Sequence, residues 1–263
     1  MPALVHAFRL LSPDEPPAVF EEGLSRRSRF LIAVDHASAR LPRRLGDLGL
    51  PAGELQRHIA WDIGALGVAR RVAEALDAPL IAQNYSRLVI DCNRDPGVAS
   101  SIPTDSEHVE IPGNKGLSAG EIEARRNEIF WPYHRRLKEL LDERKATGRA
   151  TILVAQHSMT DVYKGVTRPM HAAVLYNRDR RFAALVLDEL RREKNLIVAD
   201  NEPYFVSDAT DYTIPVHAEA RGLPHVELEI RQDLIATEAG QREWAARIGE
   251  ALRQAERRFS SDT

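Results

Sequence analysis

Short apolar runs of strand length alternate along this chain with segments of helical periodicity. Residues 29–34, RFLIAV, are typical of a buried strand, and residues 64–76 place their apolar side chains largely on one helical face. Strands joined by helices predict a three-layer α/β/α fold whose sheet is mixed and mostly parallel. Further strands are expected at 78–83, 86–92, 150–156, 195–199 and 225–230, and further helices at 118–145, 179–193 and 238–258.

Local signals mark the longest expected helix and the loop before it. Residues 93–117 carry prolines and glycines with little periodicity, which predicts a long surface loop of the kind that often has a function. Ser118 is expected to cap the helix 118–145, and Pro132 to kink or break it. The many charges of this helix, Arg125 among them, are expected on a solvated face.

Size and composition favour one domain over residues 1–263. A length of 263 residues allows one large domain or two small ones, and 43% apolar residues are enough for a sizeable core. The sequence contains no internal repeat and no linker rich in glycine or serine. We therefore expect a single domain.

Charge and cysteine content limit the partners of the chain. Its 36 basic and 39 acidic residues give a net charge of −3, so no overall positive field favours nucleic acid or a membrane surface. No apolar run approaches the ~18–20 residues of a membrane span, and the N-terminus does not resemble a signal peptide, so a cytoplasmic protein is expected. The single cysteine, Cys92, is expected to be buried, and any metal must be bound by histidines and carboxylates.

Two histidines stand at the ends of expected strands. His36 follows 29–34, and His157 follows 150–156. In α/β sheets the reacting groups lie just past the carboxyl ends of strands, so both imidazoles are candidate ligands of one divalent ion. The alternative is that each ring caps its strand or bonds a loop carbonyl.

Several carboxylates stand where a charge needs a partner or a function. Asp91 and Glu229 lie inside apolar runs, where an unpaired charge is costly to bury. Glu227 shares a strand face with Glu229 and belongs either to the site or to a solvated edge strand or salt bridge. Asp62 precedes a glycine at the beginning of a helix, where it either caps the helix or joins the site.

The segment SRLVIDCNR brings Arg87, Asn93 and Arg94 within eight residues. A guanidinium fork beside an amide suits binding of a substrate carboxylate. The sequence has no GxxxxGK[ST] or GxGxxG phosphate loop and no GxSxG elbow, which argues against nucleotide-dependent chemistry and against a serine hydrolase.

Five stretches together resemble the N-formylglutamate amidohydrolase family, metal-dependent deformylases related in fold to zinc carboxypeptidases and aspartoacylases. They run from about residue 30 to about residue 235, and the SRxVIDxNR element is the most specific. The resemblance implies a zinc-exopeptidase-like fold. The stretches are DHASARLP, WDIGA, NYSRLVIDCNRDP, AQHSM and HAEARGLPHVELEIRQDL.

The resemblance also implies roles for individual residues. His36 and His157 match zinc ligands, and Glu229 matches the general base. The related carboxypeptidases carry an HxxE pair, but the third residue after His36 is Ala39, so the third ligand must come from elsewhere. Asp62 is expected to be that ligand. The remaining matches are Arg87, Asn93 and Arg94 as groups that polarise the amide and hold the substrate carboxylate, with His217 as reserve ligand or substrate-binding residue.

The expected activity follows from these roles. A metal-dependent amidohydrolase would use one zinc ion to activate water and remove a formyl or other small acyl group from an N-acylated acidic amino acid such as N-formylglutamate. The alternatives are a zinc carboxypeptidase-like enzyme, an N-acyl amino acid deacylase, and a non-catalytic protein of the same fold that binds a small acid. The expected partner is thus a small N-acyl amino acid.

Overall fold

The computed structural model describes residues 8–261, and within them seven strands form one mixed sheet. Four neighbouring pairs are parallel, whereas β1–β3 and β11–β9 are antiparallel. The prediction of a mixed, mostly parallel sheet is confirmed. In spatial order the strands are β1 (Val19–Glu22), β3 (Leu80–Gln83), β2 (Phe30–Val34), β6 (Ile152–Met159), β11 (His225–Arg231), β9 (Ala172–Leu175) and β10 (Val198–Asp200).

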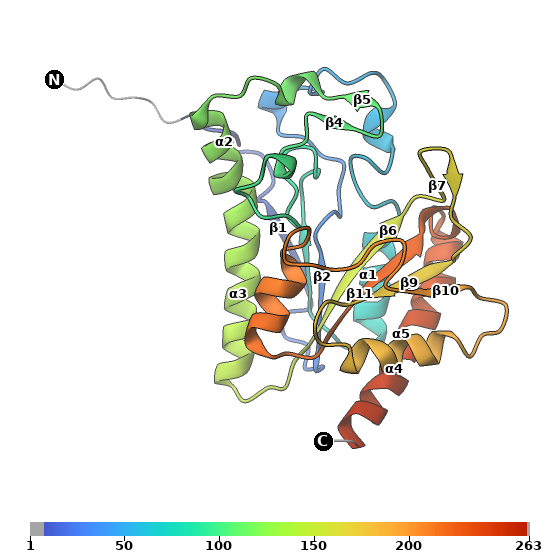
Figure 1. Ribbon diagram of the computed structural model, residues 1–263. Helices are drawn as coiled ribbons and strands as arrows, with labels where there is room; N and C mark the ends of the chain where they lie inside the picture. The colour runs from blue at the N-terminus through green and yellow to red at the C-terminus, as the bar shows by residue number, and fades with distance from the viewer. Residues whose placement is uncertain (1–7, 262–263) are drawn as a thin grey trace.

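Helices cover both faces of this sheet, which confirms the three-layer prediction (Figure 1). One layer holds α1 (Ala65–Ala75), α4 (Arg181–Leu190) and α5 (Glu238–Ser261). The other holds α2 (Ala119–Arg125) and α3 (Trp131–Ala146), joined by the π-helical segment η5 (Arg126–Phe130). Short helical turns are η1 (Arg43–Leu45), η2 (Glu54–Gln56), η3 (Ala99–Ser101), η4 (Pro112–Asn114), η6 (Thr213–Ala218), η7 (Glu219–Arg221) and η8 (Gln232–Leu234).

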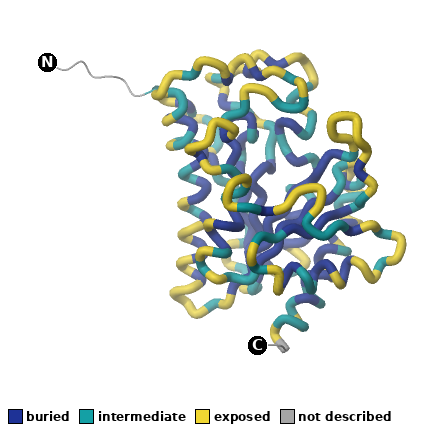
Figure 2. The backbone as a smooth tube through the Cα atoms, viewed as in Figure 1, coloured by how far each residue is buried: buried dark blue, intermediate teal, exposed yellow. Residues whose placement is uncertain are grey.

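The central strands are buried on both faces, as Figure 2 shows by their dark colour. Side chains alternate along a strand, so Ile32 and Val34 of β2 enter the core beneath α1, α4 and α5, whereas Leu31 and Ala33 enter the core beneath α3. This double burial explains why β2 and β6 are continuous apolar runs rather than alternating ones.

The segment 86–92 is not a strand, so that prediction is wrong. Its residues form turns after β3 ends at Gln83. Ser86 starts the first turn, since its Oγ donates to the carbonyl of Ala60 at 2.7 Å and accepts from the N–H of Leu88 at 3.1 Å. Burial of the apolar side chains, rather than sheet pairing, explains the β-rich composition.

The expected helix 118–145 begins and breaks as predicted. Ser118 and Glu121 form a capping box at the start of α2, and η5 interrupts the helix just before Pro132. Arg125, however, is buried rather than solvated. Its Nη1 donates to the carbonyl of Val89 at 2.8 Å and to Asn114 Oδ1 at 2.7 Å, so this arginine ties α2 to the loops above the sheet.

Two small hairpins stand near the carboxyl ends of the central strands. The long loop 93–117 contains β4 (Asp105–Ser106) and β5 (Val109–Glu110), and β6 is followed by β7 (Val162–Tyr163) and β8 (Val166–Thr167). Strands β1 and β9 were not expected. None of the helices in the described part of the chain combines the length and apolarity that a membrane crossing requires.

Candidate metal and active site

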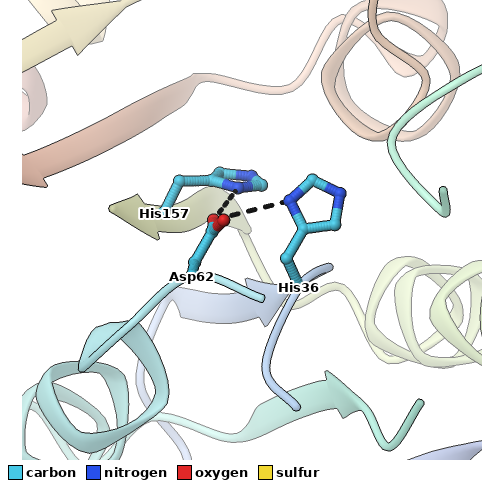
Figure 3. A group of neighbouring side chains, drawn as sticks. All are labelled: His36, Asp62 and His157. Carbon is cyan, nitrogen blue, oxygen red and sulfur yellow. Dashed lines mark hydrogen bonds and ion pairs between the residues drawn. The ribbon is translucent and has the colours of Figure 1, made fainter. Parts of the chain in front are cut away.

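The carboxyl ends of β2 and β6 lie side by side, because these strands are parallel neighbours. Asp35 and His36 follow β2 directly, as expected. His157 lies within β6 rather than after it, since the strand continues to Met159. Asp62 comes from the segment before α1, where its N–H donates to the carbonyl of His36 at 2.9 Å. In Figure 3 the side chains of His36, Asp62 and His157 point toward one another.

One oxygen of Asp62 faces both histidine rings. Asp62 Oδ2 is 2.8 Å from His157 Nδ1 and 3.4 Å from His36 Nδ1. One ligand atom from each of the three buried side chains lies within 4.8 Å of the others. Ligands at ~2.1 Å around a tetrahedral zinc ion lie ~3.4 Å apart, so donor set and spacing fit one divalent ion. The helix-cap interpretation of Asp62 is wrong, because Gly64 is the N-cap of α1 and no side chain caps it.

A second layer of carboxylates holds the outer nitrogens of the two rings. His36 Nε2 is 2.7 Å from Asp91 Oδ1, and His157 Nε2 is 3.3 Å from Asp35 Oδ2. The hydroxyl of Tyr133 in turn donates to Asp35 Oδ1 at 2.7 Å. Carboxylates behind metal-binding histidines fix the ring orientation and the tautomer, and here they leave both Nδ1 atoms toward Asp62.

The electrostatics of the site favour a cation. Burial and Arg87 oppose protonation of His36, but Asp91 and Asp62 outweigh them and raise the pKa of its ring. The carboxyl of Asp62 is also buried, yet the two histidines hold its pKa below the ordinary value. Buried carboxylates thus lie on both sides of the His36 ring, and its Nδ1, the atom that faces Asp62, has no hydrogen-bond partner among the described residues.

Two glutamates of β11 face the same region. Glu229 stands opposite His157 in the β11–β6 register, and both Glu227 and Glu229 are buried with an Oε2 that has no hydrogen-bond partner in residues 8–261. Burial raises the pKa of Glu229 to about 7, and that of Glu227 well above its ordinary value. Strand β11 lies between β6 and β9, so the solvated-edge interpretation of Glu227 is wrong.

Asp91 forms ion pairs with both arginines of SRLVIDCNR. Arg87 Nη2 is 2.8 Å and Arg94 Nε is 3.2 Å from Asp91 Oδ2, and both arginines keep part of their side chain exposed. Asn93 is engaged elsewhere. Its Oδ1 accepts from the N–H groups of Tyr212 and Thr213, and its Nδ2 donates to Asp211.

These groups open into a cavity of about 530 Å³. Its wall includes metal-candidate residues, Glu229, and aromatic side chains that the sequence did not single out, Tyr163 and Tyr204. Tyr163 lies in the two-residue strand β7 and Tyr204 in a loop, so no periodic pattern marks either. The site residues expected from sequence that line this cavity are His36, Asp62, Arg87, Asn93, Arg94, His157 and Glu229.

His217 does not line the cavity. Its ring stacks on His134 at 5.1 Å, and the two share a hydrogen bond of 2.9 Å between His217 Nε2 and His134 Nδ1. Burial lowers the pKa of His217 to about 3, so the ring is neutral. The structure therefore places this histidine in the core behind the site, and Asp62 rather than His217 stands beside the two candidate ligands. Cys92 is buried, as expected, and its carbonyl faces His134.

Comparisons with known proteins identify the family and the fold of this chain. A family model described as N-formylglutamate amidohydrolase matches residues 28–236. The crystal structure of a gene product from Agrobacterium tumefaciens is 39% identical, covers 96% of this chain and 100% of its own, and superposes with a TM-score of 0.93. N-formylglutamate amidohydrolase from Ralstonia eutropha shares the fold, with 20% identity, coverage of 92% and 98%, and a TM-score of 0.69. None of the curated proteins matches this chain. The chain belongs to the N-formylglutamate amidohydrolase family of amide hydrolases.

Proposed function

We propose that the protein is a metal-dependent hydrolase that removes a formyl or other small acyl group from an N-acylated acidic amino acid such as N-formylglutamate. The observation that carries this proposal is the buried His36–Asp62–His157 group beside Glu229 at a cavity, in a chain of this family. The cavity volume of about 530 Å³ suits a small molecule.

One divalent ion, zinc in this proposal, would be held by His36, Asp62 and His157. When bound, such an ion supplies Lewis acidity, which polarises a carbonyl and acidifies water. Asp91 is hydrogen-bonded to the outer nitrogen of His36, and Asp35 lies within ion-pair distance of that of His157, so both carboxylates help to keep the imidazoles in place. The three proposed ligands are neighbours in the described structure without any rearrangement of the chain.

Glu229 is the proposed general base. It lies beside His157 across the β11–β6 pair and lines the cavity, and its Oε2 is free to take a proton from the attacking water. The same carboxyl would then pass that proton to the leaving amine nitrogen.

The two arginines of the site would bind the negatively charged groups of the substrate and of the transition state. Arg87, whose side chain is 26% exposed, would stabilise the oxyanion that develops on the acyl carbon. Arg94 would bind the carboxylate next to the scissile amide. Asn93 uses its amide for Asp211 and the backbone, so it would support this binding by positioning the loop.

A substrate panel with metal analysis tests the proposal. Zinc-loaded protein is assayed with N-formyl and N-acetyl derivatives of glutamate, aspartate, glutamine and methionine, and metal content is measured by mass spectrometry. We expect N-formylglutamate to be among the best substrates, with one zinc ion per chain. His36→Ala should lose both metal and activity, because it removes one of the three ligands.

The matched control is His108→Asn. His108 is exposed, and its φ of 72° is a left-handed position that asparagine tolerates. This variant should keep metal and activity. Tight zinc absent from the wild type, or equal zinc in His36→Ala, would contradict the metal site, and a panel without hydrolysis would contradict the proposed reaction.

A further inference from the structure

The arginines on the cavity wall already have carboxylate partners. Arg87 and Arg94 both form ion pairs with Asp91. Further carboxylates line the cavity, Asp62 and Asp105 among them. An acidic substrate entering such a cavity needs a further positive group, beyond Arg87 and Arg94, to offset this negative charge.

Arg168 is a buried guanidinium that has no carboxylate partner among the described residues. It is 6% exposed, and its Cζ lies 5.0 Å from the ring centre of Tyr163 and 4.7 Å from that of Tyr204. Its Nη1 donates to the carbonyl of Thr160 at 3.3 Å, and its Nη2 donates to the hydroxyl of Tyr204. The structure records no acceptor for its Nε in residues 8–261. A buried cation without a counter-charge is costly, unless a ligand supplies that charge.

The three residues that hold Arg168 all belong to the cavity wall. Thr160, Tyr163 and Tyr204 line the same cavity as His36, Asp62 and Glu229, and Arg168, directly after β8, lies behind this part of the wall. Because the Tyr204 hydroxyl accepts from Arg168, its own proton remains free for a donor contact inside the cavity.

A second cation lies on the β7–β8 hairpin, in the wall of a neighbouring cavity. Lys164, at the tip of the β7–β8 hairpin, places its Nζ 5.4 Å from the ring centre of Tyr163. No described carboxylate lies within ion-pair distance of this ammonium group. The hairpin region therefore holds two cations without a described carboxylate partner, whereas Arg87 and Arg94 share Asp91.

We propose that Arg168, together with the Tyr204 hydroxyl, binds a carboxylate on the side chain of the substrate and so determines the preference for an acidic amino acid. This inference rests on the proposed function, because it names the group that recognises the far end of that substrate. The amide and its neighbouring carboxylate would lie near His36, Glu229 and Arg94, and the second carboxylate would reach the β7–β8 hairpin.

A kinetic comparison of N-formylglutamate with its neutral amide isostere, N-formylglutamine, tests the proposal. The wild type should prefer the glutamate compound by about 10–100-fold in kcat/KM, mostly through KM, since a charged hydrogen bond of this kind acts in both ground and transition states. Arg168→Met should lose that preference while it keeps hydrolysis of N-formylglutamine. Arg168→Lys should restore part of it. If Arg168 had only a structural role, Arg168→Met would lower kcat/KM for both substrates equally.

The control and the fallback variants keep the test decisive. Arg180→Met removes another cation over a tyrosine, 5.5 Å from the ring centre of Tyr176, but outside the cavity, and it should leave the preference unchanged. If Arg168→Met fails to fold, Tyr204→Phe removes only the hydroxyl and should reduce the preference selectively.

Equilibrium binding separates this inference from the proposed reaction. Calorimetry compares glutarate with glutaramate, in which one carboxylate is an amide, on wild type and on Arg168→Met. We expect wild type to bind glutarate about tenfold tighter or more, and the variant to bind both alike. If the binding difference is found but no N-formyl amino acid is hydrolysed, the proposed reaction is wrong and the subsite is supported. If Arg168→Met hydrolyses N-formylglutamate and still prefers it to N-formylglutamine, the reaction is supported and the proposed subsite is wrong.

Discussion

At the scale of single residues, the site is a balance of buried charges around Asp91 and Asp62. Asp91 accepts from His36, Arg87 and Arg94 as well as from the N–H of Asn93, so one carboxylate orients both a candidate ligand and two cations. Removal of one partner would leave the others buried and unpaired, which is why substitutions here should affect folding as well as activity.

The titration of Glu229 makes the free energy of unfolding depend on pH. Burial raises its pKa from 4.5 to about 7, helped by the charge of Asp62 and opposed by His157 and Arg87. The folded protein without metal therefore holds this proton more tightly than the unfolded chain. Its contribution to the free energy of unfolding is present below pH ~4.5 and is lost as the pH rises through about 7. We expect the stability of the wild type relative to Glu229→Gln to fall between pH 5 and pH 8, measured by urea unfolding of metal-free protein.

Glu227→Gln is the matched comparison on the same strand face. Glu227 has its pKa well above the ordinary value, mainly through burial, which favours the neutral carboxyl that an amide resembles. In metal-loaded protein Glu229→Gln should lower kcat by ~10²–10⁴ with zinc retained, and Glu227→Gln should have a much smaller effect. Equal losses in the two variants would argue against Glu229 as the base, and a parallel pH dependence of wild type and Glu229→Gln would contradict the titration.

At the scale of elements, the site depends on where α1 begins. Gly64, the N-cap of α1, has a φ of 79°, and a Cβ there would lie 2.2 Å from the carbonyl oxygen of Ile235. This close approach sets the backbone two residues after Asp62. Hence the sequence WDIGA combines a candidate ligand with the glycine that its position requires.

Gly64→Ala should therefore destabilise the protein strongly and weaken zinc binding. The left-handed backbone alone costs ~1–2 kcal/mol for an alanine, and the clash adds ~1–3 kcal/mol. Gly222→Ala is the control, because its φ is 64° but nothing lies within 4 Å of the added Cβ. Urea unfolding should show a clearly larger loss for Gly64→Ala, with zinc content reduced in that variant only. Similar losses in both would mean that the contact with Ile235 relaxes freely.

At the scale of the whole molecule, one sheet separates two apolar cores. The core on one face contains Trp244 of α5, and Trp131 of α3 packs against the other. Strands β2, β6 and β9 contribute alternate side chains to both cores, so neither helical layer keeps its packing if the sheet opens. We propose on this basis that residues 1–263 form one domain.

Unfolding followed by single tryptophans tests the one-domain proposal. The chain has three tryptophans, so replacement of Trp61 and Trp244 by Phe leaves Trp131, and replacement of Trp61 and Trp131 leaves Trp244. Fluorescence in both variants and circular dichroism should report the same urea midpoint, once corrected for the stability of each variant. Separate midpoints for the two layers within one variant, seen as a biphasic curve, would show two independently folding units.

Local patterns in the sequence determined the order of most strands and helices, the Ser118 cap and the residues of the candidate site. These features depend on neighbours within a few residues, such as the apolar run before His36 or the glycine after Asp62. The family motifs added the likeness between Glu229 and a general base, which periodicity alone does not indicate.

Only the tertiary structure decided which distant groups neutralise each buried charge. It pairs His36 with Asp91 and His157 with Asp35, and it leaves Arg168 between two tyrosines without a carboxylate. It also made 86–92 a buried turn and moved His217 into the core. The physical reason is that burial and counter-charge are properties of contacts between remote segments, whereas hydrophobic periodicity and caps are properties of adjacent ones.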